Sequence, residues 1–480
     1  MPDLKVPFAT LVLALWPLAA VGSPAAAVRA AHADAVDLPY GVARQVRYLA
    51  LYAVPEADRE EVLRVLSFHC NSLSRESELA PPRVVGGGVV RINLLDYGWK
   101  AATYDKLAEA DPYFHEQVTV VKETPGRYVY DAYGRGSWVA GKKQEVKQTA
   151  AARWLPAQEM TDLIAWTQSP APVLRADWFV AYTAVQADRK VGYYDLLSLG
   201  KKEADFQTLI GADVVKAKAV KKEVAAAVAR SRVTLNNRSM ERFPTLTGAY
   251  WRTHDYKTNT FKQNTLRLLD GDTEPPQGDA SEQYGTLPNG LFAFWLQNDK
   301  GERQDTAPDF IASDGQATGT DRRVHVGLSC IRCHTPGIQP IDDWTRRVYR
   351  GAVQLQSPDY EKLKRLQRLY LSDLEGQVKR DQADYAEALR KTNGLTPEVN
   401  AKAYARLWDR YVEHDRLPAD VARECGVTEL TLLASLKAYV KRTGQLDPIL
   451  AGLLQTPPVP VRAEHSEEVF PLLMQILGGG

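Results

Sequence analysis

The pentapeptide Cys330-Ile-Arg-Cys333-His334 constrains this chain more than any other feature of its sequence. The 480 residues contain only 4 Cys and 8 His, so a Cys-x-x-Cys-His match arises by chance in about one such chain in two thousand. Two thiols at this spacing can form thioethers to the two vinyl groups of a porphyrin, while the adjacent imidazole binds the iron from the same side. The motif therefore predicts one haem c, with Cys330 and Cys333 carrying the thioethers and His334 as the proximal iron ligand.

A Cys-x-x-Cys pair also occurs in dithiol redox sites and in zinc sites. A dithiol redox site is normally set in a βαβ unit, and the Thr-Pro-Gly that follows His334 does not indicate one. A zinc site needs two further ligands, but the sequence has no second Cys-x-x-Cys and no His-x-x-x-His. Haem is favoured over both.

The second axial ligand of the iron is less well defined. A single motif disfavours multihaem wires and dihaem peroxidases. Short cytochromes c usually take a downstream Met, yet the only Met after His334 is Met474, 140 residues away. His69 and His115, both next to aromatic residues that can wall a haem pocket, are the predicted distal candidates. The remaining possibility is a sixth position open to water and substrate.

The N-terminus is typical of a secretory signal. Lys5 precedes an apolar stretch of residues 6–21, which small residues follow. Small-x-small cleavage sites occur at 25–27 and 31–33, and the second is favoured because Asp34 begins ordinary polar sequence. We therefore expect residues 1–33 to be a signal peptide and the mature chain to be exported to the periplasm or an equivalent compartment. A membrane anchor is the alternative, although Pro17 interrupts a run barely long enough to span a bilayer.

Charge and composition narrow the expected partners. Lys+Arg 60 and Asp+Glu 59 leave a net charge of +1, so no global field favours nucleic acid or an anionic membrane surface. The hydrophobic share of 45% and the charged share of 25% are typical of a soluble globular protein. No integral membrane segment is expected after signal cleavage. The expected partner is a redox protein or a small-molecule electron donor or acceptor.

The fold is predicted to be mainly α with minor β, that is, an α+β protein of three regions after the signal. Residues 34–240 form an N-terminal α+β region, in which 117–132 read as a β-hairpin around Pro125-Gly126 and 203–230 as helical. Residues 241–345 form a haem-binding segment rich in aromatic residues, Gly and Pro, where we expect loops in a cytochrome c-like arrangement with short strands at best.

The C-terminal region, 346–480, is predicted to be helical. An apolar stripe from Leu363 to Leu389 follows a start at Ser357-Pro358 and stops at Asn393-Gly394. Thr396-Pro397 starts the next helix, and further helices are expected over 402–414, 428–442 and 463–476. Cys70 and Cys425 lie outside the haem motif. They either pair in an oxidising compartment or serve as two small buried apolar residues.

Several segments give the chain a recognisable likeness. It resembles a family of large, exported c-type cytochrome-domain proteins of planctomycete bacteria over most of its mature length. The segments that carry the likeness are SFHCNSLSRE, DPYFH, LRADWF, QADRKVGYYDLL, TLTGAYW, YGTLPNGLFAFWL, HVGLSCIRCH and PIDDWTRRVYR. The resemblance implies a haem protein in electron transfer, without a defined substrate. The alternatives are a peroxidase-like haem oxidoreductase with an open sixth iron position, and a haem-bearing sensor or partner-binding module.

Overall fold

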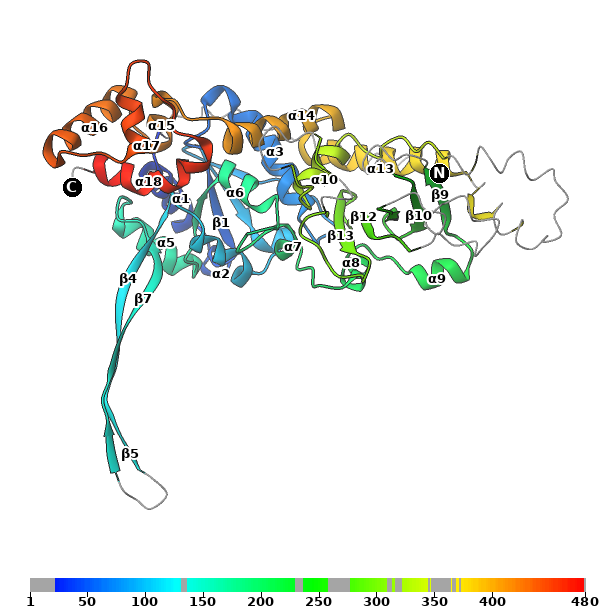
Figure 1. Ribbon diagram of the computed structural model, residues 1–480, viewed down its shortest axis with the longest axis horizontal. Coiled ribbons are helices and arrows are strands. Elements are labelled where there is room, and N and C mark those ends of the chain that lie inside the picture. Colours follow the sequence, from blue (N-terminus) through cyan, green and yellow to red (C-terminus); the bar gives the residue numbers. More distant parts are fainter. Residues whose placement is uncertain are drawn as a thin grey trace.

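Helices and strands alternate in blocks along the chain (Figure 1). The structure, a computed structural model, describes residues 22–130, 136–228, 236–257, 277–308, 313–315, 322–343, 346, 364, 368–370 and 373–478. It is 46% helical and 21% strand. The predicted α+β class is confirmed, with more strand than the sequence pattern indicated.

A four-stranded sheet organises the N-terminal part. Its order is β2-β3-β1-β8, with β1 antiparallel to β3 and parallel to β8. The strands are β1 (Val46–Ala50), β2 (Arg83–Gly86), β3 (Val89–Asn93) and β8 (Val173–Arg175). Every residue of β1 is buried, because α1 and α6 contact it. The longer helices of this part are α1 (Pro24–Val36), α3 (Arg59–Ser72), α5 (Ala157–Thr167) and α6 (Ala176–Thr183). Its short ones are α2 (Tyr40–Ala43), η1 (Glu56–Asp58), η2 (Leu94–Tyr97), α4 (Ala101–Tyr104), η3 (Asp105–Glu109) and α7 (Tyr193–Leu196).

Helix α1 belongs to the hydrophobic core. Ala27, Val28 and Ala31 are 0% exposed, and the helix contacts α5 and the first sheet. The Ser23 hydroxyl caps it by accepting a hydrogen bond from the backbone N–H of residue 26. A signal boundary after Ala33 is inconsistent with this packing, because cleavage there would remove most of a buried helix. Any cleaved leader that leaves the fold intact must end before Ser23.

A second sheet of five antiparallel strands fills much of the segment expected to be loops. Its order is β13-β12-β11-β10-β9. The strands are β9 (Val224–Val228), β10 (Arg238–Pro244), β11 (Ala249–Asp255), β12 (Ala280–Thr286) and β13 (Phe292–Asn298). Strands β12 and β13 are buried almost throughout, so they lack the polar/apolar alternation by which exposed strands are recognised. The prediction of loops with short strands at best over residues 241–345 is therefore wrong.

The two faces of this sheet meet different helices. On one face, Phe206 of α8 (Glu203–Leu209) stacks on Trp295 with ring centroids 6.0 Å apart. On the other, Phe292 stacks on Tyr385 of α13 (Leu374–Asn393) at 4.1 Å. This second face also carries the helix of the cysteine motif. Helix α9 (Val214–Ala219) contacts β10, and β9 replaces the last part of the helical stretch expected over 203–230.

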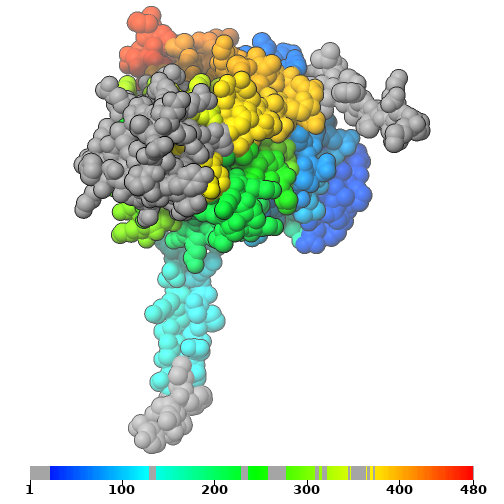
Figure 2. Space-filling model, turned by 90° about the vertical axis from the view of Figure 1, so that its right-hand side faces the viewer, coloured from blue at the N-terminus to red at the C-terminus, as the bar shows by residue number. Residues whose placement is uncertain are grey.

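A long two-stranded ribbon leaves the body near α5 (Figures 1 and 2). Strands β4 (His115–Thr124) and β7 (Lys142–Ala151) pair along their full length, and β5 (Arg127–Tyr130) pairs with β6 (Gly136–Val139) beyond them. The hairpin predicted over 117–132 is wrong, because β4 pairs with β7 and β5 with β6, so that Pro125-Gly126 lies within one side of a longer ribbon and is not a turn. Because proline has no N–H to donate to a strand ladder, Pro125 interrupts the ribbon instead. We call residues 115–151 the arm.

The C-terminal helices agree closely with their predicted ranges. Helix α13 ends at Gly394, which adopts φ 75°. Thr396 caps α14 (Pro397–Trp408) through Val399 N–H. A π-helical turn η6 (Asp409–Glu413), α15 (Pro418–Cys425), α16 (Glu429–Thr443), α17 (Pro448–Ala451), η7 (Gly452–Leu454) and α18 (Ala463–Leu477) follow. The expected helix start at Ser357-Pro358 lies outside the described residues.

The predicted regional boundaries do not divide the fold. The boundary between 240 and 241 falls inside β10, so the second sheet spans two of the predicted regions. Helices α13 and α14 both contact α3, and a single hydrophobic cluster contains residues from all three regions. Among the described residues, no helix is long and apolar enough to cross a membrane.

Candidate functional site

The cysteine motif forms a short helix, α10 (Leu328–His334), that lies against the second sheet. Cys330, Cys333 and His334 fall within one side of this helix by their spacing of three and four. The helix begins at Gly327, which adopts φ 81°. A Cβ at Gly327 would collide with the carbonyl oxygen of Ala184 and the ring of Tyr193. Only glycine suits both this conformation and this close approach.

Two polar contacts hold α10 in place. The Ser329 hydroxyl donates to Asp314 at 2.6 Å. The Arg332 guanidinium lies 3.6 Å from the same carboxylate and 5.3 Å from the centre of the Trp408 ring. Since Trp408 ends α14, the motif is fixed at the junction between the second sheet and the C-terminal helices.

His334 occupies an aromatic cage. Its ring centroid lies 5.0 Å from that of Tyr284 and 5.6 Å from that of Phe294. These two residues face each other across β12 and β13, so one sheet face presents both rings. Burial lowers the pKa of His334, although nearby Glu282 opposes the shift. The imidazole is therefore neutral at pH 7, and neutral imidazole is the form that binds metals.

Two buried polar atoms in this cage have no hydrogen-bond partner among the described residues: His334 Nδ1 and the Tyr284 hydroxyl oxygen. Buried polar groups are nearly always hydrogen-bonded, so two such atoms on neighbouring rings indicate a missing polar partner. His334 Nε2 lies 4.0 Å from Glu282 Oε1. Together with the two thiols, this donor set fits the attachment of a haem.

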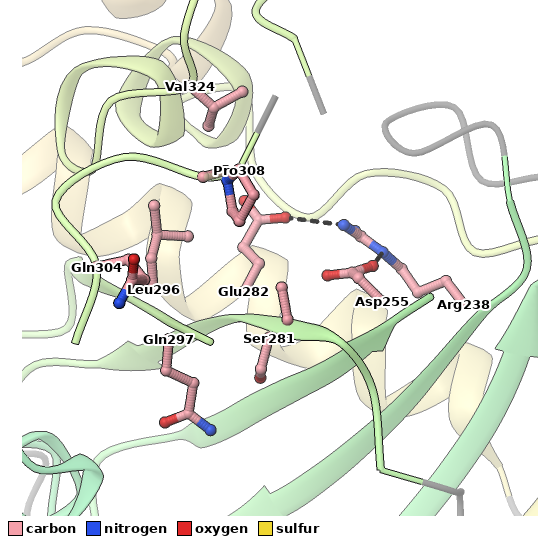
Figure 3. Close-up of a pocket in the computed structure, with 11 residues that line it drawn as sticks. Arg238, Asp255, Ser281, Glu282, Leu296, Gln297, Gln304, Pro308 and Val324 are labelled. Atoms are coloured by element: carbon pink, nitrogen blue, oxygen red, sulfur yellow. Dashed lines mark hydrogen bonds and ion pairs between the residues drawn. The ribbon is translucent and has the colours of Figure 1, made fainter. Parts of the chain in front are cut away.

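A small polar cavity lies beside Glu282 (Figure 3). Arg238 joins Glu282 at 3.2 Å and Asp255 at 2.5 Å along one wall. Leu296, Gln304 and Val324 line other parts of it. The cavity volume of about 20 Å³ holds a single water molecule. It is thus far too small to be a haem pocket.

The thiols differ in exposure and share one electrostatic property. Cys330 is 2% exposed, whereas Cys333 is half-buried. Burial raises the pKa of the Cys330 thiol well above its usual range and that of Cys333 to about 11. Dithiol oxidoreductases depend on a lowered thiol pKa, so these values argue against that use. Among the described residues no cluster of three His, Cys, Asp or Glu side chains could hold a metal ion.

In both predicted distal ligands, His69 and His115, each ring nitrogen lies within hydrogen-bond distance of another group. His69 is fully buried, with Nε2 2.8 Å from the Thr183 hydroxyl and Nδ1 3.3 Å from that of Tyr404. Burial lowers its pKa to about 3. His115 contacts the Asp111 carboxylate at 2.6 Å and the Pro170 carbonyl oxygen at 2.7 Å. Either residue would have to give up a hydrogen bond to bind iron, so the structure does not support them as ligands.

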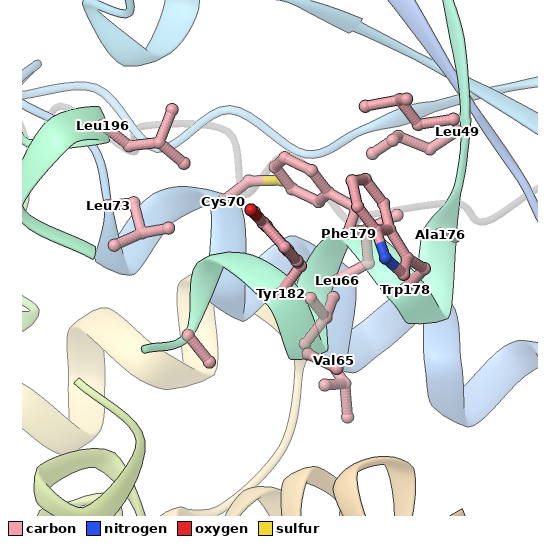
Figure 4. Packing of buried hydrophobic residues seen from close by; sticks show 14 of the residues in the cluster. Leu49, Val65, Leu66, Cys70, Leu73, Ala176, Trp178, Phe179, Tyr182 and Leu196 are labelled. Atoms are coloured by element: carbon pink, nitrogen blue, oxygen red, sulfur yellow. The ribbon is translucent and has the colours of Figure 1, made fainter. Parts of the chain in front are cut away.

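Cys70 and Cys425 are free thiols buried in the core. Cys70 packs among Leu73, Phe179 and other apolar side chains (Figure 4). Cys425 ends α15 and is 2% exposed. Burial raises the pKa of both thiols, which supports their role as small apolar residues rather than as a disulfide.

Sequence reasoning missed Glu282, Tyr284, Phe294 and Arg238. A signal for them exists: Asn289-Gly290 separates two strand-length runs, and Asn-Gly is a strong hairpin turn. Pairing β12 with β13 across that turn places Tyr284 opposite Phe294. Comparison with known proteins gives no independent assignment, because no family model, no curated protein and no solved structure matches the chain.

Proposed function

We propose that this protein carries one haem c and transfers single electrons in an exported compartment. The observation that carries the proposal is the convergence of Cys330, Cys333 and His334 on one helix, with the His334 imidazole in an aromatic cage and its Nδ1 without a hydrogen-bond partner among the described residues. Export is part of the proposal, because thioether attachment of this kind is made outside the cytoplasm.

Each residue of the site has a separate task in this proposal. Cys330 and Cys333 tether the group, and His334 supplies its proximal ligand. When bound, the haem provides the one-electron couple. The Tyr284 and Phe294 rings orient the imidazole and exclude water from it, while the Glu282 carboxylate places negative charge beside the same ring.

The chain provides its own control for attachment. The full-length protein is expressed in a host with active haem-attachment machinery, beside the double variants Cys330→Ala/Cys333→Ala and Cys70→Ala/Cys425→Ala. Intact mass of the wild type should exceed the polypeptide by one haem, about 0.6 kDa, and the adduct should survive acid denaturation. The Cys70/Cys425 variant should keep the adduct and the motif variant should lose it. A bare wild-type polypeptide would refute the proposal.

Electron transfer is distinguished from catalysis by turnover. The purified protein should titrate reversibly as a one-electron couple. It should consume added peroxide no faster than an exposed haem peptide does. Saturable peroxide turnover would assign the protein to the oxidoreductases.

The engaged nitrogens of His69 and His115 favour a second candidate, a haem with an open sixth position that binds a small ligand or substrate. Binding of carbon monoxide distinguishes this candidate from the electron carrier. The gas binds rapidly to a reduced five-coordinate iron and changes the absorption spectrum, whereas a six-coordinate electron carrier resists it.

A further inference from the structure

The packing of the body does not account for the length of the arm. From His115 to Tyr128 it extends about 40 Å at the usual rise per strand residue. Figures 1 and 2 show it projecting as a narrow column, with β5 far from the other elements. An isolated two-stranded ribbon is marginally stable in water. We therefore expect the ribbon to be stabilised by, and to serve, a contact with a partner outside the body.

Aromatic rings mark the far end of the described arm. Tyr128 is 62% exposed and Trp138 is 59% exposed, and their ring centroids are 5.2 Å apart. The Trp138 ring lies over the backbone of Gly126, where a Cβ would collide with it. This contact stabilises the ribbon and holds the indole in place while leaving most of it in solvent. Tyr and Trp rings of this kind are enriched at the interface between membrane and water.

Cations follow immediately behind these rings and lie on both faces of the ribbon. In the β4–β7 register Lys122 and Lys142 share one face, whereas Lys143 and Lys147 lie on the other. Lys122, Lys142 and Arg127 are exposed and make no ion pair within the described chain. Residues 115–151 contain six basic and four acidic residues. Of the acidic ones, Glu116 is paired with Arg153 and Glu123 with Lys143.

The order of these groups selects the occupant. A docking protein meets one face of a ribbon, whereas lysines without an ion pair in the described chain lie on both faces of this one, Lys122 and Lys142 on one and Lys147 on the other. A second copy is disfavoured because two positively charged arms repel each other and the lysines of β7 protect its edge against strand pairing. A layer of anionic lipid headgroups contacts every side of a projecting ribbon, with Tyr128 and Trp138 in the interfacial region and the cations facing the phosphates.

We propose that the arm docks this protein on an anionic phospholipid surface, through Tyr128 and Trp138 at the far end of its described part and the cations Lys122, Arg127 and Lys142. A net charge of +1 for the whole chain conceals this site, because the excess charge is local to the arm. The inference is independent of the haem, so it holds or fails separately from the proposed function.

The test is co-sedimentation of the full chain with large vesicles. One set contains phosphatidylcholine with three tenths phosphatidylglycerol, and the other is phosphatidylcholine alone. The wild type should bind the anionic vesicles at least tenfold more tightly than the neutral ones. Lys122→Glu/Arg127→Glu/Lys142→Glu should lower the anionic partition coefficient at least tenfold, since each cation near the surface contributes about fivefold. Tyr128→Ser/Trp138→Ser should lower it several-fold.

Matched changes on the body control for charge and apolarity. Lys402→Glu/Lys437→Glu/Lys441→Glu reverses three exposed lysines of α14 and α16, and Leu430→Ser removes a side chain that is 80% exposed. Neither should alter vesicle binding. Quenching of tryptophan fluorescence by spin-labelled lipid should fall in Trp138→Phe. The proposal would be overturned if the arm and body variants changed vesicle binding equally. It would also be overturned if the wild type bound anionic and neutral vesicles equally well. A concentration-dependent dimer that the arm variants abolish would overturn the proposal as well, since it would identify a second copy as the occupant.

Discussion

His334 and His69 are both buried imidazoles beside aromatic rings, yet their nitrogens meet different surroundings. Those of His69 lie within hydrogen-bond distance of two hydroxyl groups, whereas Nδ1 of His334 has no hydrogen-bond partner in the described part of the chain. Binding iron would cost His69 a hydrogen bond in the protein interior, and an unsatisfied buried group is costly. Burial and aromatic neighbours can be read from a sequence, but the partners of each nitrogen cannot. A histidine that can bind iron is therefore distinguished from a structural histidine by whether its ring nitrogens already have hydrogen-bond partners in the fold.

The pKa of about 3 for His69 predicts an acid sensitivity. Above pH 6.5 the imidazole is neutral in both folded and unfolded chains and has no effect. As the pH falls from 6.5 towards 3, only the unfolded chain gains the proton, so the free energy of unfolding decreases by about 1.4 kcal/mol per pH unit. His69→Gln should lose this component. Urea unfolding at pH 7.5, 5.5 and 4.5 measures it, and parallel curves for variant and wild type would contradict it.

Glu282 should tune the haem that we propose. Its carboxylate lies beside the His334 ring and favours the more positive, oxidised iron. Glu282→Gln should therefore raise the midpoint potential by tens of millivolts, on the order typical of changes around an iron ligand. Glu302→Gln, at an exposed carboxylate just after β13, is the matched control and should leave the potential unchanged. Redox titration of the three proteins makes the comparison.

Helices whose ends are set by capping residues could be predicted from the sequence. Strands that are buried on both faces could not, because they lack a polar/apolar alternation. The ends of α13 and α14 follow from Gly394 and Thr396, whose capping is local chemistry. Strand β13 escaped recognition because a strand buried on both faces has no alternation. The cysteine motif was readable, but the cage around His334 required tertiary pairing.

Helix α1 gives an element-scale prediction. Its buried alanines and valine pack on the first sheet, and Asp34 accepts hydrogen bonds from Tyr48 at 2.8 Å and Arg91 at 2.7 Å. A chain that begins at Asp34 should be less stable than one that begins at Gly22 by on the order of 5 kcal/mol. Urea unfolding of both chains measures the difference. After the export that we propose, N-terminal sequencing should find a start before Pro24, and a start at Asp34 would contradict the assignment of α1 to the core.

At the scale of the molecule, a buried ion network joins the first sheet to the C-terminal helices. Arg175, at the end of β8, contacts Asp177 at 2.8 Å and Glu424 of α15 at 3.1 Å. Arg416 shares the Glu424 carboxylate at 3.1 Å. These groups are nearly inaccessible to water, so each charge depends on its partners. The regions expected from the sequence should accordingly unfold together, because the network and the shared core couple them.

Glu424→Gln should lower the free energy of unfolding by about 3 kcal/mol, because two buried guanidinium groups lose a shared carboxylate. The reference is Glu387→Gln, which breaks an exposed pair with Arg390 on α13 and should leave stability unchanged. Urea titrations followed by fluorescence and by circular dichroism should give one coincident transition in the wild type. Two separate transitions would show that the N-terminal and C-terminal parts unfold independently.

The arm also has a consequence for how this protein can be modified. Its strands leave and re-enter the body at one point, since His115 pairs directly with Ala151, and such opposed residues lie about 5 Å apart. The intervening chain is therefore a cassette that a short turn can replace without stretching the body. Because side chains alternate along a strand, lengthening both strands by an even number of residues keeps the side chains beyond the insertion on the same faces of the ribbon, and an odd number exchanges the faces. Reach and orientation are thus independent variables for anyone who re-engineers this chain.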